Sequence, residues 1–173
     1  MVMIMAVAAE IDFVHTGRGT LAGKYLRMFW QPVYVAAELK SGYAVPIRIM
    51  GEDFTLYRGE SGAAYVVDFR CAHRGTQLSV GWVEQDCLRC FYHGWKYDGT
   101  GQCVEQPAEG ESFAQKIKIR SCPTQEFLGL IFAYFGGGDA PPLPRYSELE
   151  EEGEIDVGTY IRHCNYFGTL ENG

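Results

Sequence analysis

The hydrophobic pattern divides the chain into a short helical segment followed by a series of strands. Over residues 20–30, apolar side chains recur at helical spacing, with Thr20 suited to cap a helix and Pro32 suited to stop it. Over residues 44–69 the period changes to two, and glycine-containing turn clusters interrupt it. This pattern predicts a short helix with one face packed on the main domain, then three antiparallel strands.

The second half of the chain continues with short apolar runs. Further strands are predicted at Lys96–Tyr97, Gln102–Val104, Ile117–Ile119 and Phe127–Phe135. Short strands at close spacing, separated by glycine-containing turns, favour an antiparallel sandwich or barrel over a parallel α/β sheet. The predicted fold class is therefore mostly β, an antiparallel β-sandwich with a short N-terminal helix.

Composition narrows the class of protein further. The 173 residues suggest one domain, or one domain and the start of another, and 47% of them are hydrophobic, enough for a core. The net charge of −7 argues against nucleic acid and against an anionic membrane surface as partners. The apolar run at residues 1–9 is too short to span a membrane and lacks the basic start of a signal peptide. We therefore expect a cytoplasmic protein whose six cysteines form no disulfide framework.

Two short motifs carry the candidate chemistry. Cys71 and His73 form C-x-H, Cys90 and His93 form C-x-x-H, and a glycine follows each histidine within two residues. A Rieske [2Fe–2S] cluster is held by two thiolates on one iron and two imidazoles on the other, so each motif can give one ligand to each iron. The two neutral imidazoles also make an added electron easier to accept than four thiolates would. The sequence predicts this cluster, with these four residues as its ligands.

The alternative is a structural zinc site with two cysteines and two histidines. Zinc sites usually pair like ligands, as C-x₂₋₄-C and H-x₃₋₅-H, which mixed Cys-His pairs fit poorly. Cys87 and Cys90 do form a C-x-x-C, but the cluster uses Cys90, so Cys87 is expected to be a buried or partly buried free thiol. Cys103, Cys122 and Cys164 are expected to be small core residues.

The residues around the motifs suggest a family. The run at 93–101, the segment at 107–109 and the lead-in at 17–33 closely resemble oxygenase subunits of Rieske non-haem iron aromatic-ring-hydroxylating oxygenases, in particular the phthalate-dioxygenase-like branch. The resemblance implies a reductase with flavin and iron–sulfur centres as electron donor, and a homo-oligomer such as a trimer. It also implies a mononuclear Fe(II) that activates O₂ for ring hydroxylation or O-demethylation.

The motif for that second iron does not occur in the sequence. In this family the motif Asp-x-x-His-x₄-His marks the 2-His-1-carboxylate triad. Here only His15 and His163 remain after two of the four histidines are assigned to the cluster. Mononuclear Fe(II) is therefore expected only in a C-terminal part outside these 173 residues. We expect the chain to be the electron-entry part of an oxidoreductase and not to be catalytically competent alone.

The expected organisation has three parts. Residues 1–43 are the lead with the short helix, residues 44–140 the Rieske [2Fe–2S] domain, and residues 141–173 a linker with the start of a catalytic domain. Glycine and proline at 136–144 predict a stiff exposed connector, the acidic run at 148–154 a solvated loop, and residues from about Ile155 a first strand of the next domain.

Two other functions use the same cluster. A stand-alone Rieske ferredoxin would carry electrons without catalysis, although such carriers need neither the N-terminal helix nor the tail. A binding or regulatory module would keep the cluster as a structural element. Near the motifs, we expect Gly75 and Gly94 to permit tight turns whose N–H groups face sulfur, and Trp95 to shield the cluster. The basic residues that could receive an acidic donor are Arg70, Arg74, Arg89 and Lys96.

Overall fold

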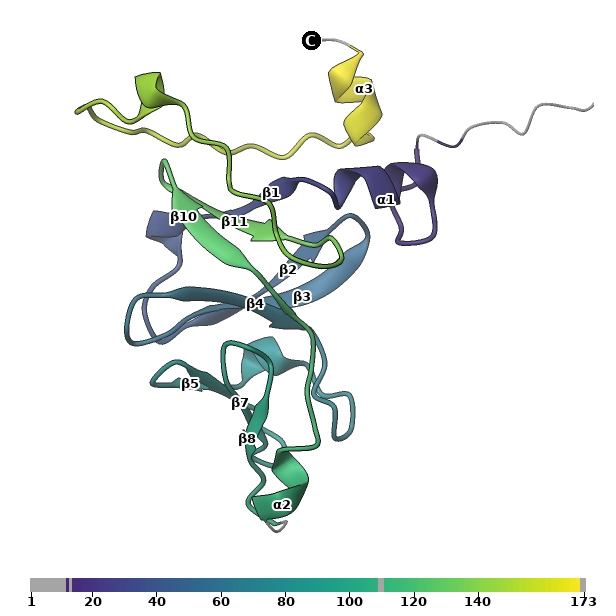
Figure 1. Cartoon of the computed structure of the whole chain (residues 1–173), viewed down its shortest axis with the longest axis vertical. Coiled ribbons are helices and arrows are strands. Elements are labelled where there is room, and N and C mark those ends of the chain that lie inside the picture. Colours follow the sequence, from purple (N-terminus) through teal and green to yellow (C-terminus); the bar gives the residue numbers. More distant parts are fainter. Residues whose placement is uncertain (1–11, 13, 109–110, 172–173) are drawn as a thin grey trace, which may run out of the picture.

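Three antiparallel sheets form the body of the molecule (Figure 1). The computed structural model describes residue 12, residues 14–108 and residues 111–171. The strands are β1 (Trp30–Val35), β2 (Ala44–Ile49), β3 (Glu52–Arg58), β4 (Ala64–Asp68), β5 (Trp82–Glu84), β6 (Cys87–Arg89), β7 (Lys96–Tyr97), β8 (Cys103–Glu105), β9 (Ser121–Cys122), β10 (Thr124–Phe127) and β11 (Leu130–Tyr134). They pair in the orders β1-β11-β10, β2-β3-β4-β9 and β5-β6-β7-β8. The predicted mostly-β, antiparallel class is confirmed.

Helices are short and lie outside the sheets (Figure 1). They are α1 (Leu21–Leu26), α2 (Glu111–Ala114) and α3 (Tyr166–Leu170), with 3₁₀ turns η1 (Ala36–Glu38), η2 (Leu78–Val80) and η3 (Ser147–Leu149). The predicted cap of α1 is confirmed, because the Thr20 hydroxyl oxygen accepts a hydrogen bond from the Gly23 N–H at 3.0 Å. The helix ends earlier than predicted, since Trp30 begins a strand that pairs with β11.

The middle sheet separates two hydrophobic cores. On one of its faces Tyr57 and Val67 pack with the residues of the β5–β8 region, and on the other Leu56 and Val66 pack with β1 and β11. Strand β3 is therefore buried on both faces, with four consecutive buried residues at its centre. Alternate side chains of β3 therefore enter one hydrophobic core or the other, and neither face of the strand is turned to water.

One face of α1 packs on the domain as predicted, but the large apolar side chains do not form that face. Its buried residues are Ala22 and Gly23, while Leu21, Tyr25 and the following Phe29 are 64%, 60% and 47% exposed. Gly23 has no room for a side chain because the segment just before the helix passes close to it. A Cβ on Gly23 would meet the backbone carbonyl of Gly17. The large apolar side chains therefore remain largely exposed.

Buried charge fastens α1 to the middle sheet. The Arg27 guanidinium donates to the carbonyl oxygens of Thr16 and Gly23, each at 2.8 Å, and to Glu52 Oε1 at 2.6 Å. Glu52 Oε2 also accepts from Arg120 Nη2 at 2.9 Å. Each buried charge is thus paired, as the low dielectric of the interior requires.

Two strand predictions differ from the structure. The segment at 117–119 forms no strand, and Lys118 makes only an isolated bridge to Gln102. The run at 127–135 is divided by a hairpin turn, with Leu128 and Gly129 at φ +49° and +73°. The turn lets β10 and β11 pair with each other, which hydrophobicity alone does not reveal.

The C-terminal segment lies along the β1-β11-β10 sheet (Figure 1). The expected exposed connector is held at two points, since Leu143 is buried and the Trp30 Nε1–H donates to the Pro141 carbonyl at 2.7 Å. The acidic run is exposed, as expected. The strand expected from about Ile155 as part of a further domain does not form in the described chain. The segment stays irregular until α3, where the Asn165 side chain accepts from the Phe167 N–H at 2.9 Å.

The cysteines are free thiols among the described residues. The core positions of Cys103 and Cys122 are confirmed, and burial raises the pKa of the Cys122 thiol to about 12. The partial burial of Cys87 is confirmed, whereas Cys164 is exposed and its predicted core position is wrong. In the described part of the chain, no helix has the length and apolar character needed to cross a membrane.

Candidate metal centre

Two loops with the same backbone frame carry the two Cys-His motifs. In the first, the Cys71 N–H donates to the Thr76 carbonyl at 2.8 Å, and the Gly75 N–H donates to the Cys71 carbonyl at 2.9 Å. In the second, the Cys90 N–H donates to the Trp95 carbonyl and the Gly94 N–H to the Cys90 carbonyl, at 2.8 and 3.0 Å. The first loop follows β4, and the second connects β6 to β7. The two ends of each loop are thus joined by the same pattern of two backbone hydrogen bonds.

The predicted role of the loop glycines is confirmed in part. Gly75 and Gly94 have φ of +71° and +74°, which L-residues rarely adopt. Their own N–H groups donate to carbonyl oxygens rather than to sulfur. In the second loop, backbone N–H groups of Tyr92 and His93 face the Cys90 sulfur, where they oppose the effect of burial, which raises the pKa of that thiol.

The structure brings the four predicted site residues together as two pairs. Cys71 and Cys90 are 3% and 2% exposed, and their thiols are neighbours. The imidazole rings of His73 and His93 lie with centroids 4.6 Å apart at 62°. Hence one pair consists of sulfur ligands and the other of nitrogen ligands, in keeping with a cluster that has two different irons.

One atom tests whether these residues fit a metal group. His73 Nδ1 is buried and has no hydrogen-bond partner among the described residues. A buried ring nitrogen without a partner is costly, and coordination to a metal removes that cost. The neighbouring His93 side chain is exposed, and its pKa is lowered by partial loss of hydration and by the nearby His73 and Arg74. The neutral imidazole, which is the ligand form, is thereby favoured.

Aromatic side chains enclose the first histidine. The Trp95 ring stacks on the His73 ring at 4.6 Å between centroids and 6° between planes. Trp95 is buried and belongs to the same core as Cys71 and Cys90. This position agrees with the expected shielding role of Trp95.

Sequence patterns did not single out Tyr97 as a site residue. Its hydroxyl lies 3.2 Å from the Cys71 sulfur and accepts from the Ala72 N–H at 3.2 Å. Burial, and then the contact with Cys71, raise the pKa of this phenol well above its usual value. A phenol held protonated beside a thiolate donates its O–H to sulfur. The signal that could have found it is an aromatic residue with a polar tip in an otherwise apolar strand.

The positive charge near the loops is smaller than the sequence suggested. Arg89 bonds to Glu84 at 2.7 Å and to Glu105 at 2.8 Å, and Lys96 lies 3.3 Å from Glu105. The two bases and two acids neutralise one another, and Arg89 and Lys96 hold the pKa of Glu105 down at about 2. Arg89 also donates to the Gly94 carbonyl at 2.8 Å, which ties this ion-pair network to the second loop. Arg70 and Arg74 remain as the exposed cations beside the loops.

Comparison with protein families identifies the centre. The family described as the Rieske [2Fe-2S] domain matches residues 29–125, which include both loops and more than half of the chain. The chain therefore belongs to the Rieske [2Fe–2S] domain family, and its cofactor is a [2Fe–2S] Rieske cluster. The zinc alternative finds no support in this match.

Its relatives are oxygenase subunits. The chain is 38% identical over 166 residues to the 3-chlorobenzoate-3,4-dioxygenase oxygenase subunit of Comamonas testosteroni, over 92% of this chain and 38% of that protein. It is 34% identical over 155 residues to the phthalate 4,5-dioxygenase oxygenase subunit of Pseudomonas putida, over 86% and 35% respectively. The resemblance to this class of oxygenase subunits, including phthalate dioxygenase, is thus confirmed.

Solved structures agree with this assignment. A chain of the reduced complex between oxygenase and ferredoxin in carbazole 1,9a-dioxygenase superimposes with a TM-score of 0.59 at 29% identity, over 79% of this chain and 37% of that chain. The chain spans less than two-fifths of the length of each relative described here. It corresponds to their Rieske part, and the mononuclear iron of such oxygenases belongs to the part not represented here.

Proposed function

We propose that Cys71, His73, Cys90 and His93 hold the [2Fe–2S] cluster, with the two thiolates on one iron and the two imidazoles on the other. The convergence of the two Cys-His loops, with sulfur and nitrogen ligands gathered as separate pairs, carries this proposal. The buried and unpartnered Nδ1 of His73 supports it. When bound, such a cluster takes up and releases one electron.

The chain's own residues set the route for that electron. Cys71 and Cys90 lie inside the core, whereas the edge of His93 is exposed. An electron donor or acceptor can therefore approach the histidine side closely, while the sulfur side is kept from water. We propose that the chain is the electron-entry part of a Rieske-type oxygenase.

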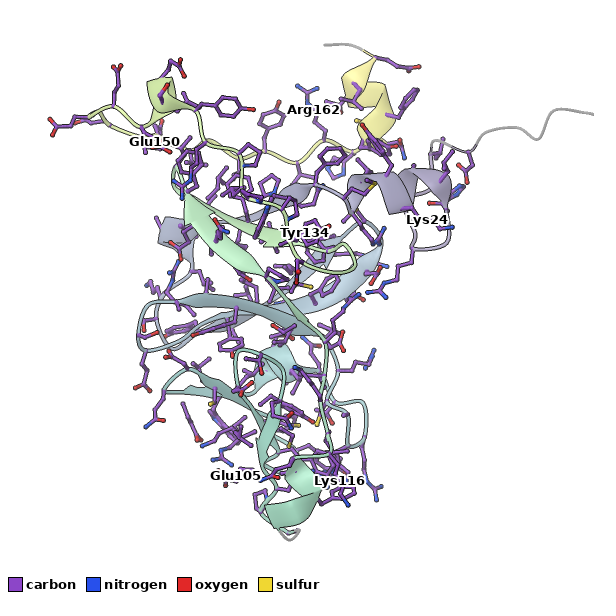
Figure 2. All side chains as sticks on the ribbon, viewed as in Figure 1. Lys24, Glu105, Lys116, Tyr134, Glu150 and Arg162 are labelled. Atoms are coloured by element: carbon purple, nitrogen blue, oxygen red, sulfur yellow. The ribbon has the colours of Figure 1, made fainter. Side chains whose placement is uncertain are left out.

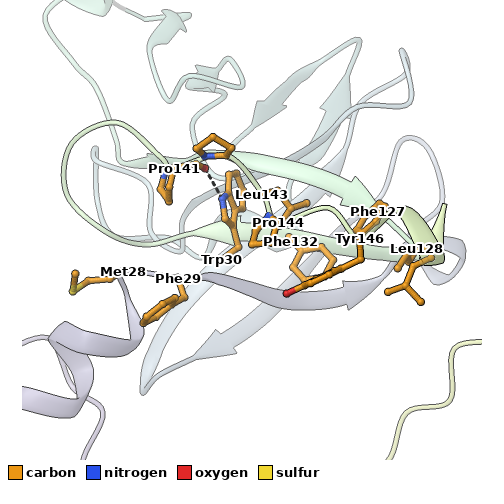
Figure 3. A pocket seen from close by; sticks show the side chains of 12 residues that line it. Met28, Phe29, Trp30, Phe127, Leu128, Phe132, Pro141, Leu143, Pro144 and Tyr146 are labelled. Atoms are coloured by element: carbon orange, nitrogen blue, oxygen red, sulfur yellow. Dashed lines mark hydrogen bonds between the residues drawn. The ribbon is translucent and has the colours of Figure 1, made fainter.

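The alternative of a stand-alone Rieske ferredoxin has less support. The likeness to oxygenase subunits extends over 92% of the chain for the Comamonas relative, well beyond the family match at residues 29–125. An independent carrier would have no use for the apolar surface at the other end of the molecule. That surface includes a cleft of about 600 Å³ between the tail and the β1-β11-β10 sheet, lined by Phe29, Phe132 and Tyr146 among others (Figure 3).

We propose further that this apolar end packs against the remainder of a longer oxygenase subunit, which contains the mononuclear Fe(II) and forms a homo-oligomer such as a trimer. The share of the relatives that the chain spans supports this proposal. Its concrete test is the coding sequence beyond Gly173, where an in-frame Asp-x-x-His-x₄-His is expected. An immediate stop codon in the natural gene would favour the ferredoxin alternative.

The donor is proposed to be a flavin- and iron–sulfur-containing reductase, or a ferredoxin as in the carbazole 1,9a-dioxygenase complex. Arg70 and Arg74 are the exposed cations that could steer an acidic donor surface towards His93. Reduction should then slow as ionic strength rises, and more weakly in Arg74→Gln. Rates of the unchanged protein that ignore salt would refute the steering role.

The ligand assignment has a spectroscopic test. His73→Ala and His93→Ala should lose the Rieske absorption and the EPR signal of the reduced protein, because one iron loses half of its protein ligands. Cys87→Ser, a change of a half-buried thiol outside the loops' ligand set, should keep both signals. A normal spectrum in either histidine variant would refute the assignment, and a colourless zinc protein would refute the cluster.

A further inference from the structure

The side chain of Gln106 lies next to the second ligand loop and is left without polar partners. Gln106 is 5% exposed, and neither its Nε2 nor its Oε1 has a hydrogen-bond partner among the described residues. A buried primary amide has two donors and one acceptor to satisfy, and leaving all of them unpaired is costly. Native structures rarely leave such a group unpaired unless a bound group completes it.

A bulge in the ladder decides which way this side chain faces. β7 and β8 pair Lys96 with Glu105 and Tyr97 with Cys103, so β8 has one extra residue, Val104, between the two pairs. Lys96 and Glu105 face outwards, where their side chains form the ion pair. Because neighbouring residues on a strand alternate faces, Trp95 and Tyr97 on either side of Lys96 point inwards. Gln106 after Glu105 points inwards too, whereas the bulged Val104 is exposed.

The inward face is the one that holds the sulfur ligands. Trp95, Tyr97 and Cys103 belong to the same buried core as Cys71 and Cys90. Gln106 follows β8 directly after the Lys96–Glu105 pair, and Trp95 directly precedes that pair on the other side. The Trp95 ring stacks on His73, and the Trp95 carbonyl accepts from the Cys90 N–H. Its side chain also lies beside the Cys103 thiol without meeting hydrogen-bond geometry.

The next residue fixes Gln106 against the loop. A Cβ on Gly94 would lie 3.0 Å from Pro107 Cγ, so the ring of the residue after Gln106 is in close contact with the glycine that follows the second motif. Gln106 therefore lies between the Lys96–Glu105 strand pair on one side and the contact of Pro107 with Gly94 on the other. A mobile surface amide would not be held in this way.

We propose that the Gln106 side-chain amide donates an N–H to a sulfur atom of the bound [2Fe–2S] cluster and raises its reduction potential. This inference rests on the proposed ligand set and adds a residue outside both motifs. An N–H directed at sulfur stabilises the reduced state, which carries more negative charge. A primary amide has two N–H groups, so the one beside the Cys103 sulfur, which lowers the pKa of that thiol, leaves the other for the cluster.

The test is the potential of the cluster-loaded 173-residue chain in Gln106→Leu and Gln106→Met, which remove both the donor and the acceptor. Each substitution should lower the equilibrium constant for reduction by about threefold to tenfold, where tenfold equals about 59 mV for one electron. Two variants are used so that poor loading of one leaves the other to decide. A potential equal to that of the unchanged chain in either loaded variant would overturn the proposal.

Gln102 supplies a matched control. Its Nε2 donates to the carbonyls of Cys103, Ala114 and Ile117 at 3.2, 3.2 and 2.8 Å, so its role is to join backbone segments. Gln102→Met should lower thermal stability and leave the potential unchanged. Equal shifts of potential in Gln102→Met and Gln106→Met would mean that any loss of packing moves the potential, which would also overturn the proposal.

A measurement on the unchanged sequence completes the design. With glutamine labelled by ¹⁵N at the side chain only, pulsed EPR of the reduced protein should detect a weak ¹⁵N coupling. The coupling should persist in Gln102→Met and vanish in Gln106→Met, and its absence from the unchanged chain would count against the bond. Failure of the unchanged chain to give any Rieske signal would instead refute the ligand set.

Discussion

At the scale of single residues, Tyr97 links the two loops of the centre. It lies two residues after the end of the second loop, yet its hydroxyl is 3.2 Å from the sulfur of Cys71 in the first. Tyr97 is fully buried, and its hydroxyl contacts the Cys71 sulfur and the Ala72 N–H. An O–H held in this position stabilises the thiolate and, still more, the reduced cluster.

Tyr97→Phe should therefore lower the reduction potential while retaining the cluster. The loss of one hydrogen bond to a charged group is worth roughly 1.5–3 kcal/mol in total, of which a part differs between redox states. We expect a decrease of about 30–60 mV, since about 59 mV corresponds to tenfold for one electron. Spectroelectrochemical titration of the loaded chain measures it.

Tyr57→Phe is the control for this prediction. Tyr57 is equally buried in the same core, but its hydroxyl donates to the Asp86 carbonyl at 3.0 Å, away from the ligands. This variant should lose stability without a change in potential. If both tyrosine variants changed the potential equally, the bond to Cys71 would not be the cause.

Residue spacing predicted the Cys-His pairs because each pair lies within four positions of the chain. The Tyr97–Cys71 contact joins residues that are 26 positions apart in the sequence, and no local sequence pattern predicts such a contact. Cys164 was assigned to the core for the opposite reason. Its strand-like neighbours suggested burial, but the described chain provides no second layer to cover it.

At the scale of the elements, the two ligand loops share a frame but differ in how tightly it is packed. Gly75 and Gly94 both need positive φ, but only Gly94 has a neighbour within 4 Å of its missing Cβ. Gly75→Ala should therefore cost about 1 kcal/mol, the usual penalty of the left-handed region. Gly94→Ala should cost more, about 2–3 kcal/mol, because Pro107 must also move.

Urea unfolding of the two loaded variants measures this difference. We expect the midpoint of Gly94→Ala to fall clearly below that of Gly75→Ala, with broadened EPR lines in Gly94→Ala only. Equal midpoints would show that Pro107 does not constrain the second loop. The comparison is internal, since both substitutions add the same methyl group.

The ion-pair network on the outer face of β6, β7 and β8 predicts a pH dependence. The pKa of Glu105 is held at about 2 in the folded chain, below its usual 4.5, chiefly by the hydrogen bond from Arg89. A depressed pKa means that the contribution is complete above about pH 4.5 and is lost as pH falls towards 2. The Glu105 side chain is 43% exposed, so solvent screening reduces the contribution to about 0.5–1 kcal/mol.

Glu105→Gln should thus be less stable than the unchanged chain at pH 7 by about 0.5–1 kcal/mol. The gap should close between pH 4.5 and pH 2, because the protonated carboxyl of the unchanged chain then resembles the amide. Urea unfolding of both proteins across this range gives the gap directly. A gap that stays constant with pH would assign the effect to packing.

The sequence predicted the helices and strands well where a single hydrophobic period is enough to identify the element. β2, β3 and β4 follow the alternation at 44–69, and α1 begins at its capping residue. Elements were missed where pairing rather than hydrophobicity defines them, as in β5 and β6 of three residues each, or β9 of two. The segment at 117–119 has the apolar character of a strand, yet only one isolated bridge forms, between Lys118 and Gln102.

At the scale of the whole molecule, two ends have different characters (Figure 2). Glu105 and Lys116 lie at the end with β8 and α2, while Glu150 and Arg162 mark the end with the tail. At the tail end, large apolar side chains are exposed on α1, on the segment that follows it, and on the tail. A second apolar cleft of about 430 Å³ lies between α1 and α3. Exposed apolar surface of this kind marks an interface.

The chain alone should therefore self-associate through its tail end. We expect its sedimentation coefficient to rise with protein concentration, and a hydrophobic dye such as ANS to bind. Leu21→Gln/Tyr25→Gln/Phe29→Gln should abolish most of both effects, because these three side chains are among the most exposed apolar groups on α1 and just after it. The reduction potential should not change, since the substitutions lie at the other end. Val80→Gln/Val104→Gln, which alters two exposed apolar residues near the centre instead, should self-associate like the unchanged chain. A monomer at every concentration that binds no dye would show that the tail end is not an unfilled interface.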